Sequence, residues 1–424
     1  MITSNEAKRL LREGRVADAE RLCEAVLERF PDDVEALNIV ALAAVRDGKP
    51  VRAVAMLERA TALDPANAVS FHHLSRAQET AGNLPAALKS TAEAVRLKPD
   101  FYLSRLHYAM LLERSGETEA SVMQYARALL DAQVRGQWVN AATTPVGLQK
   151  PVKHAVQIVR TRRRALLSAI AATMARRHGQ AALARVEKCV RVYLGEEPAA
   201  FPDPRQKPSF LYFPGLPASA YLDQARFSWI APLEAQTGAI REELLRLLPS
   251  AEGRERVFTS DELERQNLRG AGATPGWNGY YFYRHGVRRD DNCASCPITS
   301  AALDRLPLSR VRDHGPEVLF SVFTPGTHLL PHRGVTNTRV VGHLPLIVPE
   351  NCALKVGGEV HAWQEGKVVV FDDTYEHEAW NRSNEARVIL IFDVWNPHLT
   401  GIEQAAVADV VEAIGGFREA LERL

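Results

Sequence analysis

A spacing of 34 residues recurs through the first third of the chain. Four glycines share it: Gly14, Gly48, Gly82 and Gly116. Three further sets keep the same spacing: Ala19, Ala53 and Ala87; Ala60, Ala94 and Ala128; Pro31, Pro65 and Pro99. Glycine suits the turn between two helices, alanine their close crossing, and proline the end of each unit. The period therefore predicts an all-α solenoid of stacked helix pairs over residues 1–135.

The length of this period is that of the tetratricopeptide repeat. The aromatic positions of that repeat's pattern are mostly aliphatic here, whereas the period itself is kept. Because solenoids of this kind present a concave surface, we expect a groove that docks a protein or peptide. A spacer or a dimerisation module is the alternative, and the period does not identify the partner.

Composition narrows the class of protein. A chain of 424 residues has room for two or three domains. Its formal net charge of +1 gives no overall preference for nucleic acid or for a membrane surface. Five cysteines without framework spacing favour a reducing compartment. The N-terminus reads as a charged amphipathic helix, and no apolar run reaches the ~18 residues of a membrane span, so we expect a cytoplasmic protein.

Residues 136–204 lose the period but keep a helical pattern, and we interpret them as a connector. Two helices are predicted, Pro151–Arg176 and Gln180–Leu194. The basic run Arg160–Arg164 has no interleaved aromatic residues, which favours a solvated helix face over a nucleic-acid site. The proline-rich stretch Glu197–Pro208 predicts a domain boundary.

The predicted third domain, residues 205–424, opens with mixed elements. The stretch SFLYFPGLP predicts a strand that runs into a turn, and Ile230–Leu248 has the spacing of an amphipathic helix. Gly276–Gly286 predicts an aromatic strand. Its large side chains are candidates either for a substrate cleft or for the core: Trp277, Tyr280, Tyr281 and Tyr283.

Cys293 and Cys296 form a single CxxC pair. A zinc site of this type needs a second pair, and redox catalysis needs a thioredoxin-like context, neither of which the sequence provides. We therefore expect buried, reduced thiols. A regulatory disulfide is the alternative.

Short segments bounded by turn residues follow. The predicted strands are Thr338–Val348, Cys352–Val356, Val360–Trp363, Lys367–Phe371 and Ala386–Trp395, with a hairpin turn at Gly357-Gly358. Many short strands with tight turns and no helical period indicate a double-sheet jelly roll or barrel.

Two histidines stand at the ends of strand-like segments in this region. His332 closes an apolar run, and His377 follows a run of β-branched residues and an Asp-Asp turn. Histidines so arranged in a β-barrel are typical of non-haem Fe(II) sites, usually with an acidic residue two positions after the first histidine. That position is Gly334 in this chain.

The chain resembles the aspartyl/asparaginyl β-hydroxylase family of Fe(II)/2-oxoglutarate dioxygenases in four stretches: PGTHLLPHRGVTNTR, GHLPLIVP, WQEGKVVVFDDTYEHEAWN and FDVWNPHLT. This family holds iron with two histidines and no carboxylate. The resemblance therefore implies that His332 and His377 are the metal ligands and the catalytic residues. It covers about the last half of the chain and implies Fe(II) and 2-oxoglutarate as cofactors.

The resemblance also implies the cofactor contacts. His343 matches the residue that contacts the C1 carboxylate end of 2-oxoglutarate. Arg387 matches the arginine that pairs with the distal carboxylate, and Ser321 matches the hydroxyl that touches the same group. A guanidinium suits this task because it offers a planar, charged, bidentate fork. By strand alternation alone, an outward-facing surface role for Arg387 is equally compatible with the VILIF stretch that follows it.

One departure from the family is Val341, where the better-known animal members have an arginine. Arg339 is retained on the same predicted strand face as Val341 and His343. We expect Arg339 to contact the substrate or the cofactor. Three acidic residues beside His377 are candidates to orient its ring: Asp372, Asp373 and Glu376. An Asp-Asp turn, however, is more often a strand cap.

The reaction implied is hydroxylation coupled to oxidative decarboxylation of 2-oxoglutarate to succinate and CO2. The expected substrate is the β-carbon of Asp or Asn in a protein or peptide. A halogenation reaction, or hydroxylation of a lipid acyl chain or a small molecule on the same scaffold, is one alternative. A non-catalytic, repeat-based binding protein is the other, which the retention of a full set of site residues disfavours.

The expected fold class is therefore α+β multidomain. An N-terminal all-α tetratricopeptide solenoid is followed by a helical connector and by a C-terminal double-stranded β-helix (a cupin-like jelly roll) with flanking helices. The expected partners are a protein or peptide substrate, with no nucleic acid and no membrane.

Overall fold

The computed structural model describes residues 4–249, 253–270 and 276–424. The chain divides into two compact units, one of residues 1–163 with 417–424 and the other of residues 164–416. The first three residues of the predicted N-terminal helix lie outside the described residues. Two long helices, α9 (Gln149–His178) and α16 (Gly401–Glu422), each contribute residues to both units.

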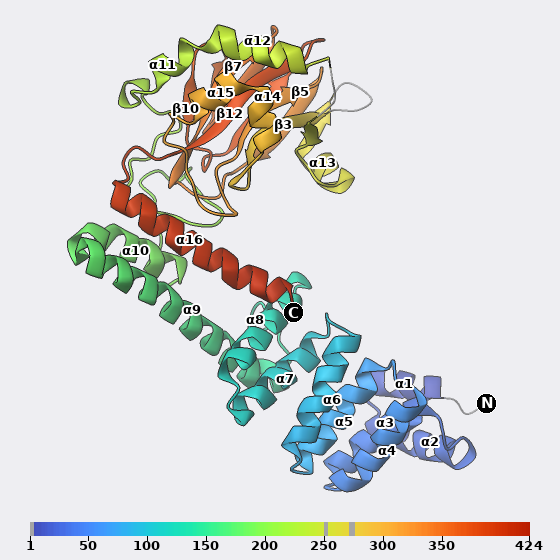
Figure 1. Cartoon of the computed structure of the whole chain (residues 1–424). Coiled ribbons are helices and arrows are strands. Elements are labelled where there is room, and N and C mark those ends of the chain that lie inside the picture. Colours follow the sequence, from blue (N-terminus) through green and yellow to red (C-terminus); the bar gives the residue numbers. More distant parts are fainter. Residues whose placement is uncertain (1–3, 250–252, 271–275) are drawn as a thin grey trace. The chain divides into compact units, whose positions relative to one another are not determined.

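The first unit is a solenoid of consecutive helix pairs (Figure 1). The described helices of the solenoid are α1 (Ser4–Arg12), α2 (Val16–Arg29), α3 (Val34–Arg46), α4 (Pro50–Leu63), α5 (Ala68–Thr80), α6 (Leu84–Leu97), α7 (Tyr102–Ser115) and α8 (Thr118–Val134). Each helix packs on the next, both within a pair and between pairs. The predicted solenoid is confirmed.

The residues that carry the period have the roles that the sequence predicted. The four turn glycines adopt left-handed φ angles between 73° and 87°, a region that side chains with a Cβ rarely adopt. The six periodic alanines are fully buried, so neighbouring helices approach closely at those points. Asp33 and Asn67 accept hydrogen bonds from backbone N–H groups at the starts of α3 and α5.

The region predicted as a connector holds the short helix η1 (Val146–Leu148), α9, η2 (Gln180–Leu183) and α10 (Ala184–Tyr193). The two predicted connector helices are present as α9 and as η2 with α10. The arginines of the run at 160–164 are all exposed. Arg162 pairs with Glu119 and Arg164 with Glu196, as expected of a solvated helix face.

The second unit holds two antiparallel sheets. In the larger sheet the strands of the described chain lie in the order β1 (Arg254–Arg256), β3 (Trp277–Arg284), β5 (Val318–Phe323), β12 (Arg387–Trp395), β7 (Arg339–Ile347) and β10 (Val369–Phe371), with β4 (Val287–Arg288) paired to β3. In the smaller sheet the order is β2 (Leu268–Gly270), β6 (Thr327–His332), β11 (His377–Asn381), β8 (Cys352–Val356) and β9 (Glu359–Ala362). Two such sheets with a shared interior are consistent with a jelly roll.

Alternation along the strands separates two cores. On β12, Val388, Leu390 and Phe392 face one side of the larger sheet, where they pack against helices. Those helices are α11 (Ile230–Glu234), α12 (Thr237–Leu247), α14 (Asp290–Ser295) and α15 (Pro297–Leu303), while η3 (Gln224–Arg226) and α13 (Asp261–Asn267) lie elsewhere in the unit. The odd-numbered residues of β12 face the smaller sheet, so polar groups there point into the interior between the sheets.

Two predictions about the start of this unit are wrong. The predicted helix Ile230–Leu248 is broken into α11 and α12. The break follows Glu234, because its carboxylate accepts hydrogen bonds from Val368 N–H (2.9 Å) and Lys367 Nζ (2.9 Å). The Thr237 hydroxyl in turn donates to the Glu234 carbonyl. The predicted strand in SFLYFPGLP is a single bridge from Leu211 to Thr336. A side-chain acceptor replaces the ladder there, since Phe213 N–H donates to Asn337 Oδ1 at 2.7 Å.

The structure also bears on the state of the cysteines and on membrane-spanning helices. All five cysteines are buried free thiols, and Cys293 and Cys296 lie in the core beneath α12. Burial raises the pKa of the Cys296 thiol to about 12, which keeps it protonated and unreactive. No described helix combines the length and the hydropathy that a bilayer crossing requires.

Candidate functional site

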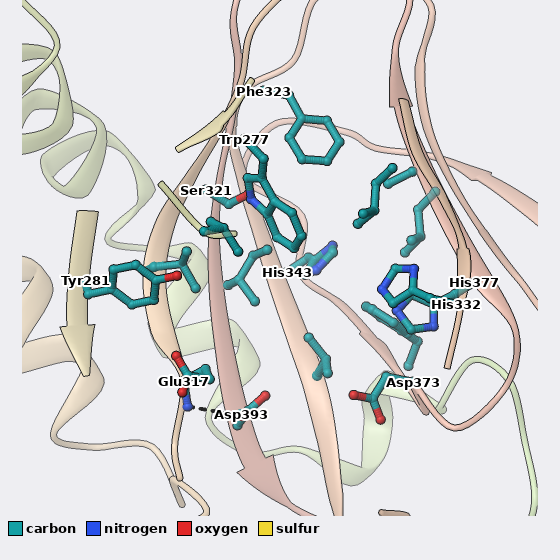
Figure 2. Close-up of a pocket in the computed structure, with 18 of the residues that line it drawn as sticks. Trp277, Tyr281, Glu317, Ser321, Phe323, His332, His343, Asp373, His377 and Asp393 are labelled. Atoms are coloured by element: carbon teal, nitrogen blue, oxygen red, sulfur yellow. Dashed lines mark hydrogen bonds between the residues drawn. The ribbon is translucent and has the colours of Figure 1, made fainter. Parts of the chain in front are cut away.

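A cavity of about 400 Å³ lies between the two sheets of the second unit (Figure 2). One wall comes from the inward-facing residues of β3, β5, β12 and β7. The other wall comes from β6, β8 and β11 of the smaller sheet. Since strand residues alternate between faces, each strand sends every second side chain into this space.

His332 and His377 lie side by side at the smaller sheet. The two residues are paired directly across β6 and β11, and their ring centroids are 4.0 Å apart. Nδ1 of His332 lies 2.8 Å from the Leu330 carbonyl, and Nδ1 of His377 lies 3.1 Å from the Tyr375 carbonyl. Because a carbonyl oxygen only accepts, Nδ1 carries the proton in each ring. This leaves an unprotonated Nε2 on both imidazoles, the form that binds a metal ion.

Burial also keeps both rings neutral. It lowers the pKa of His332, and burial together with the neighbouring His332 lowers the pKa of His377 to about 4. Figure 2 shows both rings projecting into the cavity. In the described chain, no group of three or more His, Cys, Asp or Glu side chains is arranged to hold a metal ion.

The carboxylate of Asp373 occupies the space beside Gly334. A Cβ at Gly334 would come within 2.1 Å of Asp373 Oδ1, and Gly334 N–H donates to the Asp373 carbonyl at 2.6 Å. Asp373 is 6% exposed, and its Oδ1 has no hydrogen-bond partner among the described residues. Its other oxygen lies 3.1 Å from Arg339. An acidic group thus reaches the neighbourhood of the two histidines from the turn between β10 and β11, rather than from position 334.

Arg387 lies at the far end of the cavity in an unusual environment. Its side chain is buried, with Cζ 3.7 Å from the Phe323 ring centroid and 4.9 Å from that of Trp363. Nη1 makes only long contacts to Ser321, at 3.3 Å to Oγ and 3.4 Å to the carbonyl. Nε has no hydrogen-bond partner in the described chain, and burial lowers the pKa of the guanidinium to about 9. A buried cation without an anion is costly, so this end of the cavity fits a negatively charged ligand.

Ser321 and His343 complete this end. Ser321 Oγ accepts a hydrogen bond of 2.9 Å from Trp277 Nε1. His343 is 6% exposed, and its Nδ1 is buried without a partner among the described residues. Burial and the nearby Arg387 hold the pKa of His343 well below its usual value, so the ring is neutral. Figure 2 shows His343 between Ser321 and the two histidines.

Arg339 also faces the cavity, but its charge is compensated. Its guanidinium lies 2.6 Å from Asp393 and 3.1 Å from Asp373. Although burial opposes the charge, these two carboxylates raise the pKa of Arg339. The expected contact of Arg339 with a cofactor or substrate would compete with this double ion pair. Arg339 is better suited to hold Asp373 in position.

The structure brings the six candidate residues of the sequence to one cavity: Ser321, His332, Arg339, His343, His377 and Arg387. In the aromatic strand, Trp277 and Tyr281 line the cavity, whereas Tyr280 and Tyr283 face the core, because a bulge between Tyr281 and Tyr283 interrupts the alternation. The sequence did not single out Glu317 or Asp393, which line the opposite end. Asp393 lies at an inward position of β12 and Glu317 directly precedes β5, and these placements are recognisable only once the sheet is known.

The chain matches two families. Residues 234–397 match the aspartyl/asparaginyl beta-hydroxylase family, and residues 4–68 and 74–134 match the tetratricopeptide repeat family. A human protein named aspartyl/asparaginyl beta-hydroxylase is 36% identical over 172 residues, which are 40% of this chain and 21% of that protein. An ornithine lipid ester-linked acyl 2-hydroxylase of Rhizobium tropici is 36% identical over 178 residues, 41% of this chain and 60% of that protein.

These similarities are partial. The chain spans 21% of the length of the human relative and 60% of the length of the Rhizobium tropici relative. Among solved structures, a crystal structure of MamA protein is similar over 46% of this chain and 94% of that chain, with 16% identity and a TM-score of 0.30. A Thermobaculum terrenum O-GlcNAc transferase mutant is similar over 30% of this chain and 25% of that chain, with 27% identity and a TM-score of 0.29.

Proposed function

We propose that the chain is an Fe(II)- and 2-oxoglutarate-dependent hydroxylase, because it carries a domain of the aspartyl/asparaginyl beta-hydroxylase family. This domain follows a set of tetratricopeptide repeats. His332 and His377 would hold the metal ion through Nε2. When bound, Fe(II) and 2-oxoglutarate would supply the chemistry that inserts one oxygen atom of O2 into a substrate C–H bond, with the keto acid converted to succinate and CO2.

The observation that carries this proposal is the uncompensated guanidinium of Arg387. A dicarboxylate of the size of 2-oxoglutarate fits a cavity of about 400 Å³, with one carboxylate toward Arg387 and Ser321. Arginine binds a carboxylate through two parallel hydrogen bonds, which would satisfy the unpartnered Nε. His343, neutral and with an unpartnered Nδ1, can contribute a hydrogen bond toward the other end of the ligand.

The remaining residues would position these groups. The backbone carbonyls of Leu330 and Tyr375 fix the tautomer and the orientation of the two metal-binding rings. Asp373 Oδ1 is an available acceptor for a hydrogen-bond donor beside the metal site, such as water. Arg339 holds that carboxylate in place.

The substrate class that we propose is a protein or peptide, hydroxylated at the β-carbon of an Asp- or Asn-type side chain. The name of the matched family and the presence of repeats support this class. The repeats would dock a segment of the partner while another segment reaches the cavity. Synthetic peptides and mass detection of a hydroxyl group would test it.

A lipid acyl chain is the second candidate substrate. The similarity to an ornithine lipid ester-linked acyl 2-hydroxylase is as strong, at 36% identity, as the similarity to the human hydroxylase. Incubation of the enzyme with vesicles that contain ornithine lipid, followed by mass analysis of the acyl chains, separates the two candidates.

Calorimetric titration tests the cofactor assignment without turnover. We would titrate 2-oxoglutarate into the protein loaded with Mn(II), a redox-inert stand-in. Arg387→Met should weaken binding by about two orders of magnitude, because truncating one partner of a buried charge pair costs about 2–5 kcal/mol. Arg382→Met, which removes an exposed arginine of the same unit, is the matched control and should bind normally. Equal binding by both variants would contradict the assignment.

A further inference from the structure

The end of the cavity away from Ser321 is acidic. Figure 2 shows Glu317 and Asp393 together there, with Asp373 on the side of His332 and His377. Arg339 lies among them and pairs with both aspartates. Burial raises the pKa of Glu317 to about 7, and once Glu317 is ionised, three carboxylates face one guanidinium and leave an excess of negative charge at this end.

Two of these carboxylates have capacity for a ligand. Asp373 is 6% exposed, and its Oδ1 is buried without a hydrogen-bond partner among the described residues. Glu317 contacts His285 through one oxygen only, since Oε1 accepts from His285 N–H at 2.6 Å and lies 2.8 Å from Nδ1. The third carboxylate is fully engaged, because Asp393 Oδ1 bonds to Arg339 and Oδ2 accepts from Glu317 N–H.

The other charged group at this end does not offset the excess. Arg284 lines the cavity, but it forms an ion pair with Glu255 and stacks 4.5 Å from the centroid of the Tyr281 ring. Burial lowers the pKa of His285, which therefore stays neutral at physiological pH. Arg284 and Arg339, the two arginines in the described lining of this end, are therefore already paired with carboxylates.

Val341 adds an apolar surface between the acidic end and the cofactor end. It lies on the same face of β7 as Arg339 and His343, and its cross-strand neighbours are Asp393 and Phe371. An arginine at this position would offer a cation to the substrate. Valine offers none, so a substrate carboxylate here would face Asp393 and Asp373 without an available counter-charge. Like charges so close are strongly unfavourable in a desolvated site.

We infer that the substrate group beside the metal site carries no negative charge, and that a cationic group next to it binds the acidic end through Glu317 and Asp373. The inference rests on the proposed function and narrows its substrate. For a peptide, it selects an uncharged side chain such as that of Asn over that of Asp, with Lys or Arg as a close neighbour. Val341 and Glu317 are then residues that determine specificity.

The test uses four synthetic heptapeptides and the full chain. The peptides combine a central Asn or Asp with flanking Lys or Glu residues. Binding to the anaerobic complex of protein, Fe(II) and 2-oxoglutarate is followed by the change in its visible absorption band. The band before any peptide is added reports on the proposed function, so its absence and a wrong charge preference are separate results.

We expect the Asn–Lys peptide to bind at least about tenfold more tightly than the Asp–Glu peptide, because opposite charge at a desolvated site favours binding and like charge opposes it. Glu317→Gln should remove most of this preference, and Val341→Arg should shift it toward the peptide with central Asp. Glu359→Gln removes an exposed carboxylate that does not line the cavity, and should keep the wild-type preference. The inference is overturned if the band forms but the acidic peptide binds equally well, if the basic peptide fails to bind at millimolar concentration, or if Glu317→Gln changes nothing.

Discussion

The carboxylate of Asp373 lies where the side chain of residue 334 would begin. A Cβ built on Gly334 would be 2.1 Å from both Cγ and Oδ1 of Asp373. Glycine is therefore required at this position as long as Asp373 keeps its place. Residue 334 is therefore a glycine, and the acidic group beside it is Asp373 from the turn between β10 and β11.

This relationship predicts a reciprocal swap. Gly334→Ala should destabilise the protein by about 1–3 kcal/mol, because the added methyl group overpacks the site or expels Asp373. The double variant Gly334→Asp/Asp373→Gly keeps one carboxylate in the same region and should recover much of the lost stability. Chemical denaturation measures this recovery. A double variant no better than the single variants would show that the two positions are not equivalent.

Arg387 should enable ligand binding without stabilising the ligand-free protein. Its guanidinium is buried without a carboxylate partner, so the ligand-free protein carries an uncompensated charge. Arg387→Met should leave the ligand-free protein as stable as the wild type, or more stable by about 1 kcal/mol. In the wild type, 2-oxoglutarate at 100 times its Kd should add about 2.7 kcal/mol, a gain that the variant loses at the same concentration. A variant that is strongly destabilised without ligand would contradict this account of Arg387.

Arg339 should behave in the opposite way. Asp393 and Asp373 are 3% and 6% exposed, and both depend on this guanidinium. Arg339→Met leaves two buried carboxylates without their cation and should cost about 3–5 kcal/mol of the free energy of unfolding. Denaturant unfolding of Arg339→Met and Arg387→Met side by side separates a positioning arginine from a ligand-binding one. Similar stability of the two variants would contradict the distinction.

The acidic end should give the protein a specific pH dependence. Burial and the nearby Asp393 raise the pKa of Glu317 from 4.5 to about 7. Between these values the folded state holds a proton that the unfolded state has released, so the free energy of unfolding falls as pH rises through this window. Glu317→Gln removes the group.

The expected outcome is therefore a difference between variants. Glu317→Gln should match the wild type at about pH 4.5 and become more stable than the wild type at pH 8. Unfolding by denaturant at both pH values measures the effect, with the exposed Glu359→Gln as control. A constant difference between Glu317→Gln and the wild type at the two pH values would rule out a raised pKa for Glu317.

Much of the fold follows from local patterns in the sequence. The 34-residue period fixed the helix pairs because it reports turn and crossing positions directly. The strands predicted at 338–348, 352–356 and 386–395 appear within one residue of those bounds, since alternation and tight turns mark them. The two wrong elements, at 209–217 and 230–248, depend on side-chain contacts to distant residues such as Asn337 and Val368.

The site could be predicted only in part. The resemblance named six residues that the structure brings to one cavity, and their roles remain proposals. The pairing of Arg339 with Asp393, 54 residues away, follows from β7 lying beside β12, which no local pattern reveals. The contact of Asp373 with Gly334 depends on the conformation of a turn. The acidic end was missed for the same reason, because Glu317 and Asp393 come together only in the sheet.

The most direct test of the central claim is an anaerobic titration of the protein with Fe(II) and 2-oxoglutarate, followed by visible absorption. We expect a charge-transfer band of the chelated keto acid in the wild type. The band should be absent in His332→Ala and in His377→Ala, and it should need much higher 2-oxoglutarate in Arg387→Met. No band in the folded wild-type protein at saturating Fe(II) and 2-oxoglutarate would contradict the proposed function.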